Sequence, residues 1–221
     1  MTRIKICGIR DLAHGLAAVE AGADFIGLVF APGKRQVSPA QAREITSAVK
    51  KSSNAAKVVG VFVNAPIFQI NEIADLCALD VVQLSGDESW EHCRKIVNPV
   101  IKAIRIGQQS PEELYAELSA ASELLTGRRF ITLLDSRVRG KYGGTGESFN
   151  WNLVQEVAKR FPAIIAGGLN PKNVARLIER VAPWGVDVSS GVETGGVKDM
   201  VKIRAFIEAV RKADEKRQAT T

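Results

Sequence analysis

Short apolar runs alternate with amphipathic stretches along almost the whole chain. The apolar runs are rich in β-branched residues and are bounded by turn-forming residues, as is typical of strands. They predict strands at 4–7, 25–30, 57–63, 81–84, 100–106, 130–135, 163–166 and 186–189. The stretches between them have helical periodicity and predict helices at 12–21, 39–50, 67–76, 89–97, 111–125, 151–160, 171–182 and 198–212. Strands that alternate with helices in this way indicate βαβ units and a parallel sheet.

Three of the predicted helices have clear start signals. Ser38, Ser110 and Asn170 each stand directly before a proline, which places a cap residue ahead of proline at the first helical position. Glu113 follows Ser110 by three residues and completes the pattern of a capping box. These signals fix the starts of the second, fifth and seventh predicted helices.

The repeated strand–helix unit predicts an α/β fold. Eight such units in a chain of 221 residues match a compact (β/α)8 TIM barrel with a single domain at 1–211. The last residues, 212–221, are polar, and we expect them to form a frayed C-terminal tail. The alternative is a doubly wound open sheet, but no Gly-x-Gly-x-x-Gly motif follows the first predicted strand.

Composition and charge narrow the class of protein. Lys and Arg exceed Asp and Glu by 30 to 24, a formal net charge of +6, and the basic residues are spread along the chain. This excess is compatible with a nucleic-acid partner or with a small anionic substrate. No long apolar segment or leader pattern occurs, so we expect a cytoplasmic protein with no membrane partner. The three cysteines, at 7, 77 and 93, form no metal-binding pattern with the two histidines.

Cys7 is the first candidate for chemistry, because it ends the first predicted strand. Strand periodicity places Lys5 on the same face, two residues behind the thiol. A nearby ammonium favours the thiolate, which is the form of cysteine that acts as a base or nucleophile. The alternative interpretation is a small buried apolar residue.

Asp135 and Arg35 follow other predicted strands. Asp135 ends the sixth strand ahead of a glycine-rich loop at 141–146, where long loops are often lids. It is a candidate general acid for a reaction in which Cys7 is the base, although an acid of this kind needs a raised pKa. Its alternative role is a turn or cap residue. Arg35, in the loop after the second strand, fits a carboxylate-binding role or is a solvated cation.

Glycines follow the last two predicted strands. Gly167 and Gly168 come after the seventh strand, and Ser190 and Gly191 come after the eighth, which contains Asp187. In barrels of this kind the loops after strands seven and eight often bind phosphate through exposed backbone N–H groups. These residues are therefore a predicted phosphate cradle, with ordinary turn glycines as the alternative.

Seven motifs occur in an order that resembles the phosphoribosylanthranilate isomerase family from about residue 2 to residue 210. They are Lys-Ile-Cys-Gly at 5–8, the segments at 27–30 and 34–38, Gly-Val-Phe-Val-Asn at 60–64, Val-Gln-Leu at 82–84, Leu-Asp at 134–135 with Gly-Gly-Thr-Gly at 143–146, Ala-Gly-Gly-Leu at 166–169 and 187–193. Two departures are notable. Ser85 stands where the family usually has histidine, and Gly33 and Gln36 replace a serine and an aromatic residue.

The resemblance implies an Amadori rearrangement of N-(5'-phosphoribosyl)anthranilate in tryptophan biosynthesis. It implies that Asp135 is the general acid, that Cys7 is the general base and that Arg35 binds the anthranilate carboxylate. It also implies that the glycine cradle binds the phosphate, that Asp187 lies near the sugar, and that no metal or organic cofactor takes part.

The expected partner is thus a small phosphosugar rather than nucleic acid, and the chain is expected to be a monomer or a homodimer. Two alternatives stay open at this point. One is another phosphosugar barrel enzyme, and the other is a non-catalytic phosphate-binding barrel.

Overall fold

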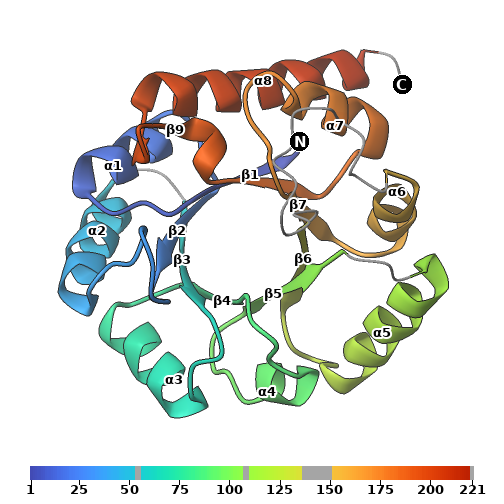
Figure 1. Ribbon diagram of the computed structural model, residues 1–221, viewed down its shortest axis with the longest axis horizontal. Coiled ribbons are helices and arrows are strands. Elements are labelled where there is room, and N and C mark those ends of the chain that lie inside the picture. Colours follow the sequence, from blue (N-terminus) through green and yellow to red (C-terminus); the bar gives the residue numbers. More distant parts are fainter. Residues whose placement is uncertain (53–55, 107–109, 136–150, 220–221) are drawn as a thin grey trace.

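Eight parallel strands close into a barrel in sequence order, and helices surround it (Figure 1). The computed structural model describes residues 1–52, 56–106, 110–135 and 151–219. The strands are β1 (Arg3–Cys7), β2 (Phe25–Val29), β3 (Lys57–Phe62), β4 (Val81–Leu84), β5 (Val100–Arg105), β6 (Phe130–Asp135), β7 (Ala163–Ala166) and β8 (Gly185–Val188). β8 pairs with β1 and completes the closure. The predicted (β/α)8 barrel is confirmed.

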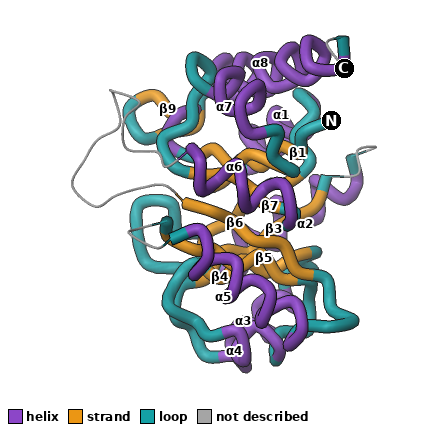
Figure 2. The backbone as a smooth tube through the Cα atoms, turned by 90° about the vertical axis from the view of Figure 1, so that its right-hand side faces the viewer, coloured by secondary structure: helices purple, strands orange, loops and turns teal. Residues whose placement is uncertain are grey.

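The helices lie outside the barrel wall, one after each strand (Figures 1 and 2). They are α1 (Leu12–Glu20), α2 (Pro39–Lys51), α3 (Ile67–Leu76), α4 (Trp90–Arg94), α5 (Pro111–Leu124), α6 (Trp151–Arg160), α7 (Val174–Val181) and α8 (Met200–Gln218). The capping box of α5 is confirmed, with Ser110 and Glu113 bonded reciprocally. Ser38 caps α2 as predicted and forms a second capping box with Gln41. Within the described residues, none of the helices has the length and apolar character needed to cross a bilayer.

The seventh helix begins later than the sequence predicts. The sequence predicts Asn170 as the cap and residue 171 as the first helical residue. This prediction is wrong, because α7 begins only at Val174. The side chain of Asn170 accepts a hydrogen bond from the backbone N–H of Lys172 (2.9 Å), and Asn173 accepts one from Asn170 (2.8 Å). These bonds form a turn that competes with helical hydrogen bonding, as Asn side chains commonly do.

The expected frayed tail from residue 212 is also wrong, because α8 continues to Gln218. Asp214 is only 3% exposed. Its carboxylate accepts hydrogen bonds from the backbone N–H of Thr2 (2.6 Å) and from the Thr2 hydroxyl (2.7 Å). The end of α8 therefore holds the N-terminus, and both chain ends lie on the same side of the barrel (Figures 1 and 2).

The core has two layers that follow from the alternation of side chains along each strand. A small cluster fills the barrel interior, consisting of Val59, Ile101, Leu133, Ile164 and Ala166. A larger cluster packs between the barrel wall and the helices. Because the interior cluster fills the barrel, open space lies beyond the strand ends, where this fold places its chemistry.

Candidate active site

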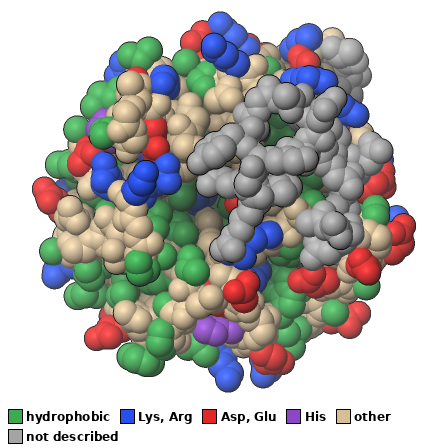
Figure 3. Space-filling view, viewed as in Figure 1, with side chains coloured by type: hydrophobic (Ala, Val, Ile, Leu, Met, Phe, Trp, Pro, Cys, Tyr) green, Lys and Arg blue, Asp and Glu red, His purple; other side chains and the backbone are tan. Residues whose placement is uncertain are grey.

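Four of the predicted site residues meet in one cavity at the carboxyl ends of the strands. The cavity has a volume of about 290 Å³, and Cys7, Arg35, Asp135 and Asp187 all line it. They come from β1, the loop after β2, β6 and β8, so the closed barrel joins residues that are far apart in sequence. Figure 3 views this face, where Lys and Arg side chains gather on the β2 side of the barrel.

Lys5, Cys7 and Asp187 form a buried cluster inside the barrel wall. The Nζ of Lys5 lies 2.8 Å from a carboxylate oxygen of Asp187, and Lys5 is only 1% exposed. A Cβ built on Gly27 of the neighbouring β2 would lie 3.0 Å from both the Lys5 Nζ and the Cys7 Sγ. Glycine at this position therefore leaves the space in which the ammonium and the thiol approach each other.

The electrostatics of this cluster act in opposite directions on the thiol. Burial raises the pKa of Cys7, while the charge of Lys5 and a hydrogen bond from it partly offset that rise. Burial lowers the pKa of Lys5, but the interactions with the Asp187 carboxylate and with Cys7 have a larger, opposite effect. The pKa of Lys5 is therefore raised overall. Lys5 is therefore held as a cation beside the thiol, which is the arrangement that stabilises a thiolate.

Arg35 is held by a carboxylate that the sequence analysis did not identify. Its Nε and Nη2 each donate a 2.7 Å hydrogen bond to Glu193. Lys198 donates a 2.8 Å bond to the same carboxylate and another to the backbone oxygen of Ser189. Burial would raise the pKa of Glu193, but the bonds from Arg35 and Lys198 lower it to about 2. Glu193 is therefore a fixed anion.

A small hairpin places Glu193 beside Lys198. It consists of β9 (Glu193–Thr194) and β10 (Val197–Lys198), which pair antiparallel so that Glu193 lies opposite Lys198. Its turn is formed by Gly195 and Gly196, both with positive φ. Two glycines between short strand-like runs are a hairpin signal, so the sequence did contain this information. The predicted helix start at 198 missed it, and α8 begins at Met200.

Asp135 lines the same cavity as Cys7. It is half-buried at the end of β6, where it lies between Arg105 of β5 and Ala166 of β7 in the sheet register. Arg105 also lines the cavity. The predicted glycine-rich lid at 141–146 lies outside the described residues.

The predicted phosphate cradle lies at the ends of β7 and β8, next to the cavity. Gly167 and Gly168 both have positive φ, +106° and +68°, which side chains other than glycine rarely adopt. Ser190 and Gly191 belong to the 3₁₀ turn η1 (Ser190–Val192). A Cβ on Gly191 would collide with the carbonyl oxygen of Leu169, so glycine lets the two loops touch.

Comparison with known proteins is consistent across the whole chain. Residues 4–209 match the family described as N-(5'phosphoribosyl)anthranilate (PRA) isomerase. The chain is 43% identical over 217 residues to N-(5'-phosphoribosyl)anthranilate isomerase of Dehalococcoides mccartyi, covering 98% of this chain and 99% of the relative. It is 47% identical over 216 residues to the enzyme of the same name from Moorella thermoacetica, covering 97% and 92%.

Solved structures give the same result. Phosphoribosyl anthranilate isomerase from Thermotoga maritima superposes with a TM-score of 0.81 at 40% identity, covering 96% of this chain and 100% of that one. A structure of phosphoribosyl anthranilate isomerase in complex with reduced 1-(o-carboxyphenylamino)-1-deoxyribulose 5-phosphate superposes with a TM-score of 0.78 at 38% identity and the same coverage.

Proposed function

The chain belongs to the N-(5'-phosphoribosyl)anthranilate isomerase family, and we propose that Cys7 and Asp135 are the base and the acid of its reaction. The enzyme is an aldose–ketose isomerase of tryptophan biosynthesis that converts N-(5'-phosphoribosyl)anthranilate to 1-(o-carboxyphenylamino)-1-deoxyribulose 5-phosphate. The observation that carries the residue assignment is that Cys7 and Asp135 line one cavity from different strands. A thiol and a carboxyl group on two strands that are not neighbours in the barrel match a reaction with two separate proton transfers.

The first step opens the sugar ring. Asp135 gives its proton to the ring oxygen, the bond between that oxygen and C1' breaks, and the nitrogen lone pair forms a C1'=N double bond. The intermediate is a protonated Schiff base. The substrate nitrogen accepts no proton from the protein in this step, so the charge that develops on it comes from its own lone pair.

The second step removes the proton from C2'. The Cys7 thiolate takes this proton, the electron pair forms a C1'=C2' double bond, and the nitrogen becomes neutral again. The resulting enolamine tautomerises to the ketone product. Lys5 supports the step by stabilising the thiolate, and Asp187 holds Lys5 in place through the 2.8 Å contact. Asp187 is therefore a positioning residue beside the sugar.

Arg35 and the glycine cradle bind the two ends of the substrate. Glu193 engages the Nε and Nη2 of Arg35, whereas no described residue accepts a hydrogen bond from its Nη1. The outer edge of the guanidinium is thus available for the anthranilate carboxylate. Gly167, Gly168, Ser190 and Gly191 bind the phosphate at the strand ends through backbone groups, with Gly167 and Gly168 in the positive-φ region and Ser190 and Gly191 in the η1 turn.

We also propose a cytoplasmic setting, because the mechanism requires Cys7 to stay reduced. All three cysteines are free thiols. The partner is the small phosphosugar substrate, and the chain works as a monomer or a homodimer. The Thermotoga maritima relative is described as dimeric.

The direct test is turnover of freshly prepared N-(5'-phosphoribosyl)anthranilate, followed by the loss of its fluorescence. The product has the same mass as the substrate, so it is identified by the reduction of its ketone with borohydride, which adds two hydrogen atoms. A second test is growth without tryptophan of a bacterial strain that lacks its own isomerase and expresses this chain. Turnover and growth are expected. A folded protein that binds phosphate esters but fails both tests would contradict the proposed function.

A further inference from the structure

Gln83 lines the active-site cavity and has an unsatisfied hydrogen-bond acceptor. Its side chain is in β4, lines the same cavity as Cys7 and Asp135, and is only 4% exposed. Its Oε1 is buried and has no hydrogen-bond partner among the described residues. Buried polar atoms are almost always paired, because an unpaired acceptor destabilises the folded chain. An unpaired one inside a substrate cavity points to a ligand that donates a hydrogen bond.

The nitrogen end of the Gln83 amide fixes the orientation of the side chain. Its Nε2 donates a 2.9 Å hydrogen bond to the hydroxyl of Ser85, two residues along the chain. The backbone N–H of Ser85 in turn donates a 2.9 Å bond to Phe62 at the end of β3. Because the nitrogen end of the amide is committed to Ser85, the oxygen end is the part left for the cavity.

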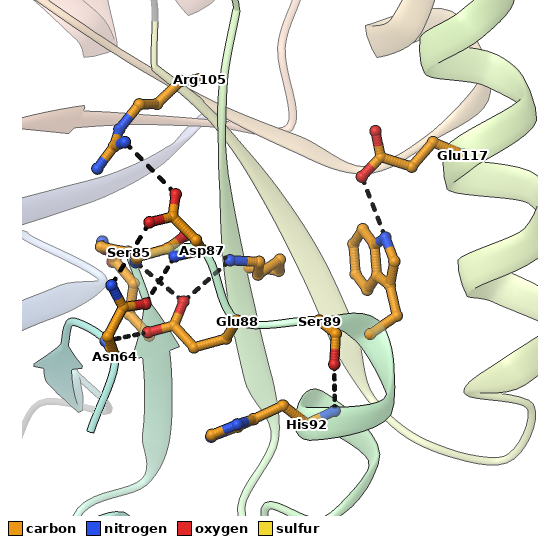
Figure 4. Close-up of polar contacts among 12 residues, drawn as sticks. Asn64, Ser85, Asp87, Glu88, Ser89, His92, Arg105 and Glu117 are labelled. Atoms are coloured by element: carbon orange, nitrogen blue, oxygen red, sulfur yellow. Dashed lines mark hydrogen bonds and ion pairs between the residues drawn. The ribbon is translucent and has the colours of Figure 1, made fainter. Parts of the chain in front are cut away.

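The loop that carries Ser85 is anchored by a buried ion pair on its far side (Figure 4). Lys102 of β5 lies 3.0 Å from Glu88 and donates a 2.9 Å bond to the backbone oxygen of Gly86. Glu88 accepts bonds from the backbone N–H groups of Gly86 (2.9 Å) and Asn64 (2.7 Å). This network fixes the backbone just after Ser85, so the orientation of the Gln83 amide is set before substrate binds.

We propose that the Oε1 of Gln83 accepts a hydrogen bond from the N–H of the substrate's anthranilate nitrogen. This inference rests on the proposed function and deepens it. When the ring opens, that nitrogen becomes the positively charged N–H of the Schiff base, and the bond to the amide oxygen strengthens. A neutral amide stabilises this charge without removing the proton, so the nitrogen remains the electron sink for the abstraction at C2'.

An amide suits this position better than an ionisable group. A preorganised dipole aimed at developing charge in a site shielded from solvent contributes mainly to the chemical step. A carboxylate there would compete for the nitrogen's proton and quench the iminium. Gln83 neither gives nor takes a proton, and the atom balance of the two steps above is unchanged.

The test replaces the acceptor with a side chain of similar length. Gln83→Met is expected to lower kcat about 100-fold, the size of effect seen when one preorganised polar partner is removed. Affinity for the reduced product analogue, which has a neutral nitrogen, is expected to fall by less than about tenfold. The matched control, Gln69→Met, makes the same change at an exposed position of α3 and is expected to leave both values unchanged.

Thermal melts separate this role from a structural one. Gln83→Met removes an unpaired buried acceptor but also the 2.9 Å bond to Ser85, so its melting temperature is expected to match that of Ser85→Ala, which loses the same bond. A melting temperature well below that of Ser85→Ala would mean that the oxygen has a structural partner, and would overturn the inference. If Gln83→Met does not fold, Ser85→Ala removes the hydroxyl that orients the amide, and a loss of kcat of about tenfold is expected.

The outcomes distinguish the two proposals. A parent protein with no turnover would contradict the proposed function itself. An active parent whose Gln83→Met variant has the same kcat would overturn only the role of Gln83. A variant that keeps kcat but loses affinity for substrate and analogue in equal measure would place the bond on a sugar hydroxyl and also overturn the inference.

Discussion

The two sides of the cavity differ in how far the protein satisfies its own polar groups. On the side formed by β1, β2 and β8, Lys5 is paired with Asp187, and Arg35 and Lys198 are both paired with Glu193. On the side formed by β4 and β5, the Gln83 oxygen has no partner among the described residues. On this side Arg105 makes a 3.7 Å contact with the exposed Asp87.

The difference suggests that the two sides of the cavity have separate roles in the reaction. The β1–β2–β8 side prepares the base, because its charges are fixed around Cys7 before substrate arrives. The β4–β5 side is completed only when substrate binds and supplies the hydrogen-bond donor that the Gln83 oxygen lacks. Substitutions on the first side should therefore change stability and the pH dependence of the reaction, whereas those on the second should change turnover with little effect on stability.

The largest expected effect is the loss of either proton-transfer group. Cys7→Ala and Asp135→Asn should each lower kcat by about 10²–10⁴-fold, the usual contribution of one positioned acid or base. Turnover of N-(5'-phosphoribosyl)anthranilate measures the loss, and thermal melts confirm folding. Cys77→Ala is the matched control, because Cys77 is a buried free thiol in the core outside the cavity. Similar losses in all three variants would contradict specific roles for Cys7 and Asp135.

The second prediction breaks the buried pair that prepares the base. Lys5→Met leaves Asp187 buried without its partner, which should reduce the free energy of unfolding by about 3–5 kcal/mol. It also removes the charge that lowers the pKa of Cys7. Because the thiolate is the active form, the acid limb of the kcat/KM profile should move to higher pH.

The control for this prediction removes both charges. Lys5→Met with Asp187→Asn should recover part of the stability but should not restore the pH profile. A single Lys5→Met variant with parental stability and an unshifted acid limb would contradict the role of Lys5.

The third prediction concerns Glu193, whose pKa is lowered from 4.5 to about 2. A lowered pKa in the folded state adds stability that is present above pH 4.5 and is lost as the pH falls towards 2. The contribution is at most about 3 kcal/mol. Denaturant unfolding from pH 5 to pH 2 should therefore show a smaller pH dependence in Glu193→Gln than in the parent.

Glu193→Gln should also raise KM, by about tenfold, because Arg35 loses the charge-assisted bonds that orient it for the anthranilate carboxylate. Its effect on kcat should be small. A variant whose KM and acid unfolding both match those of the parent would show that the carboxylate does not position Arg35.

The smallest effect is expected at the exposed pair on the other side. Asp87→Asn should change the free energy of unfolding by less than about 1 kcal/mol, because Asp87 and Arg105 are mostly exposed and loosely paired. Denaturant melts check this value. The buried Lys102–Glu88 pair stabilises the loop behind this side without lining the cavity. A larger loss would mean that the charged group lining the cavity there, Arg105, also stabilises the fold, and the contrast between the two sides of the cavity would be wrong.

Much of the fold could be predicted because its determinants are local. The apolar runs that form the strands and the Ser38 and Ser110 caps follow from short stretches of sequence, and these predictions are confirmed. The end of α8 could not be predicted from its polar composition. Asp214 accepts a hydrogen bond from the backbone N–H of Thr2. This contact joins the two ends of the chain, and no local sequence pattern predicts it.

The candidate site was predictable in part for the same reason. Cys7, Asp135 and Asp187 are recognisable at strand ends, and barrel closure brings them together. The pairing of Arg35 with Glu193 depends on a hairpin following β8, and it joins residues that are distant in sequence. The free oxygen of Gln83 depends on which atoms lie around it in three dimensions, so the sequence alone does not reveal it.

The most direct test of the central claim is the deuterium isotope effect on kcat with substrate deuterated at C2'. Cys7→Ser weakens the base, so proton abstraction should limit turnover and the isotope effect should rise above that of the parent. Asp135→Asn slows ring opening, so the isotope effect should fall towards unity. Opposite changes are predicted if Cys7 and Asp135 carry the two separate proton transfers. The same change in both variants would contradict that division.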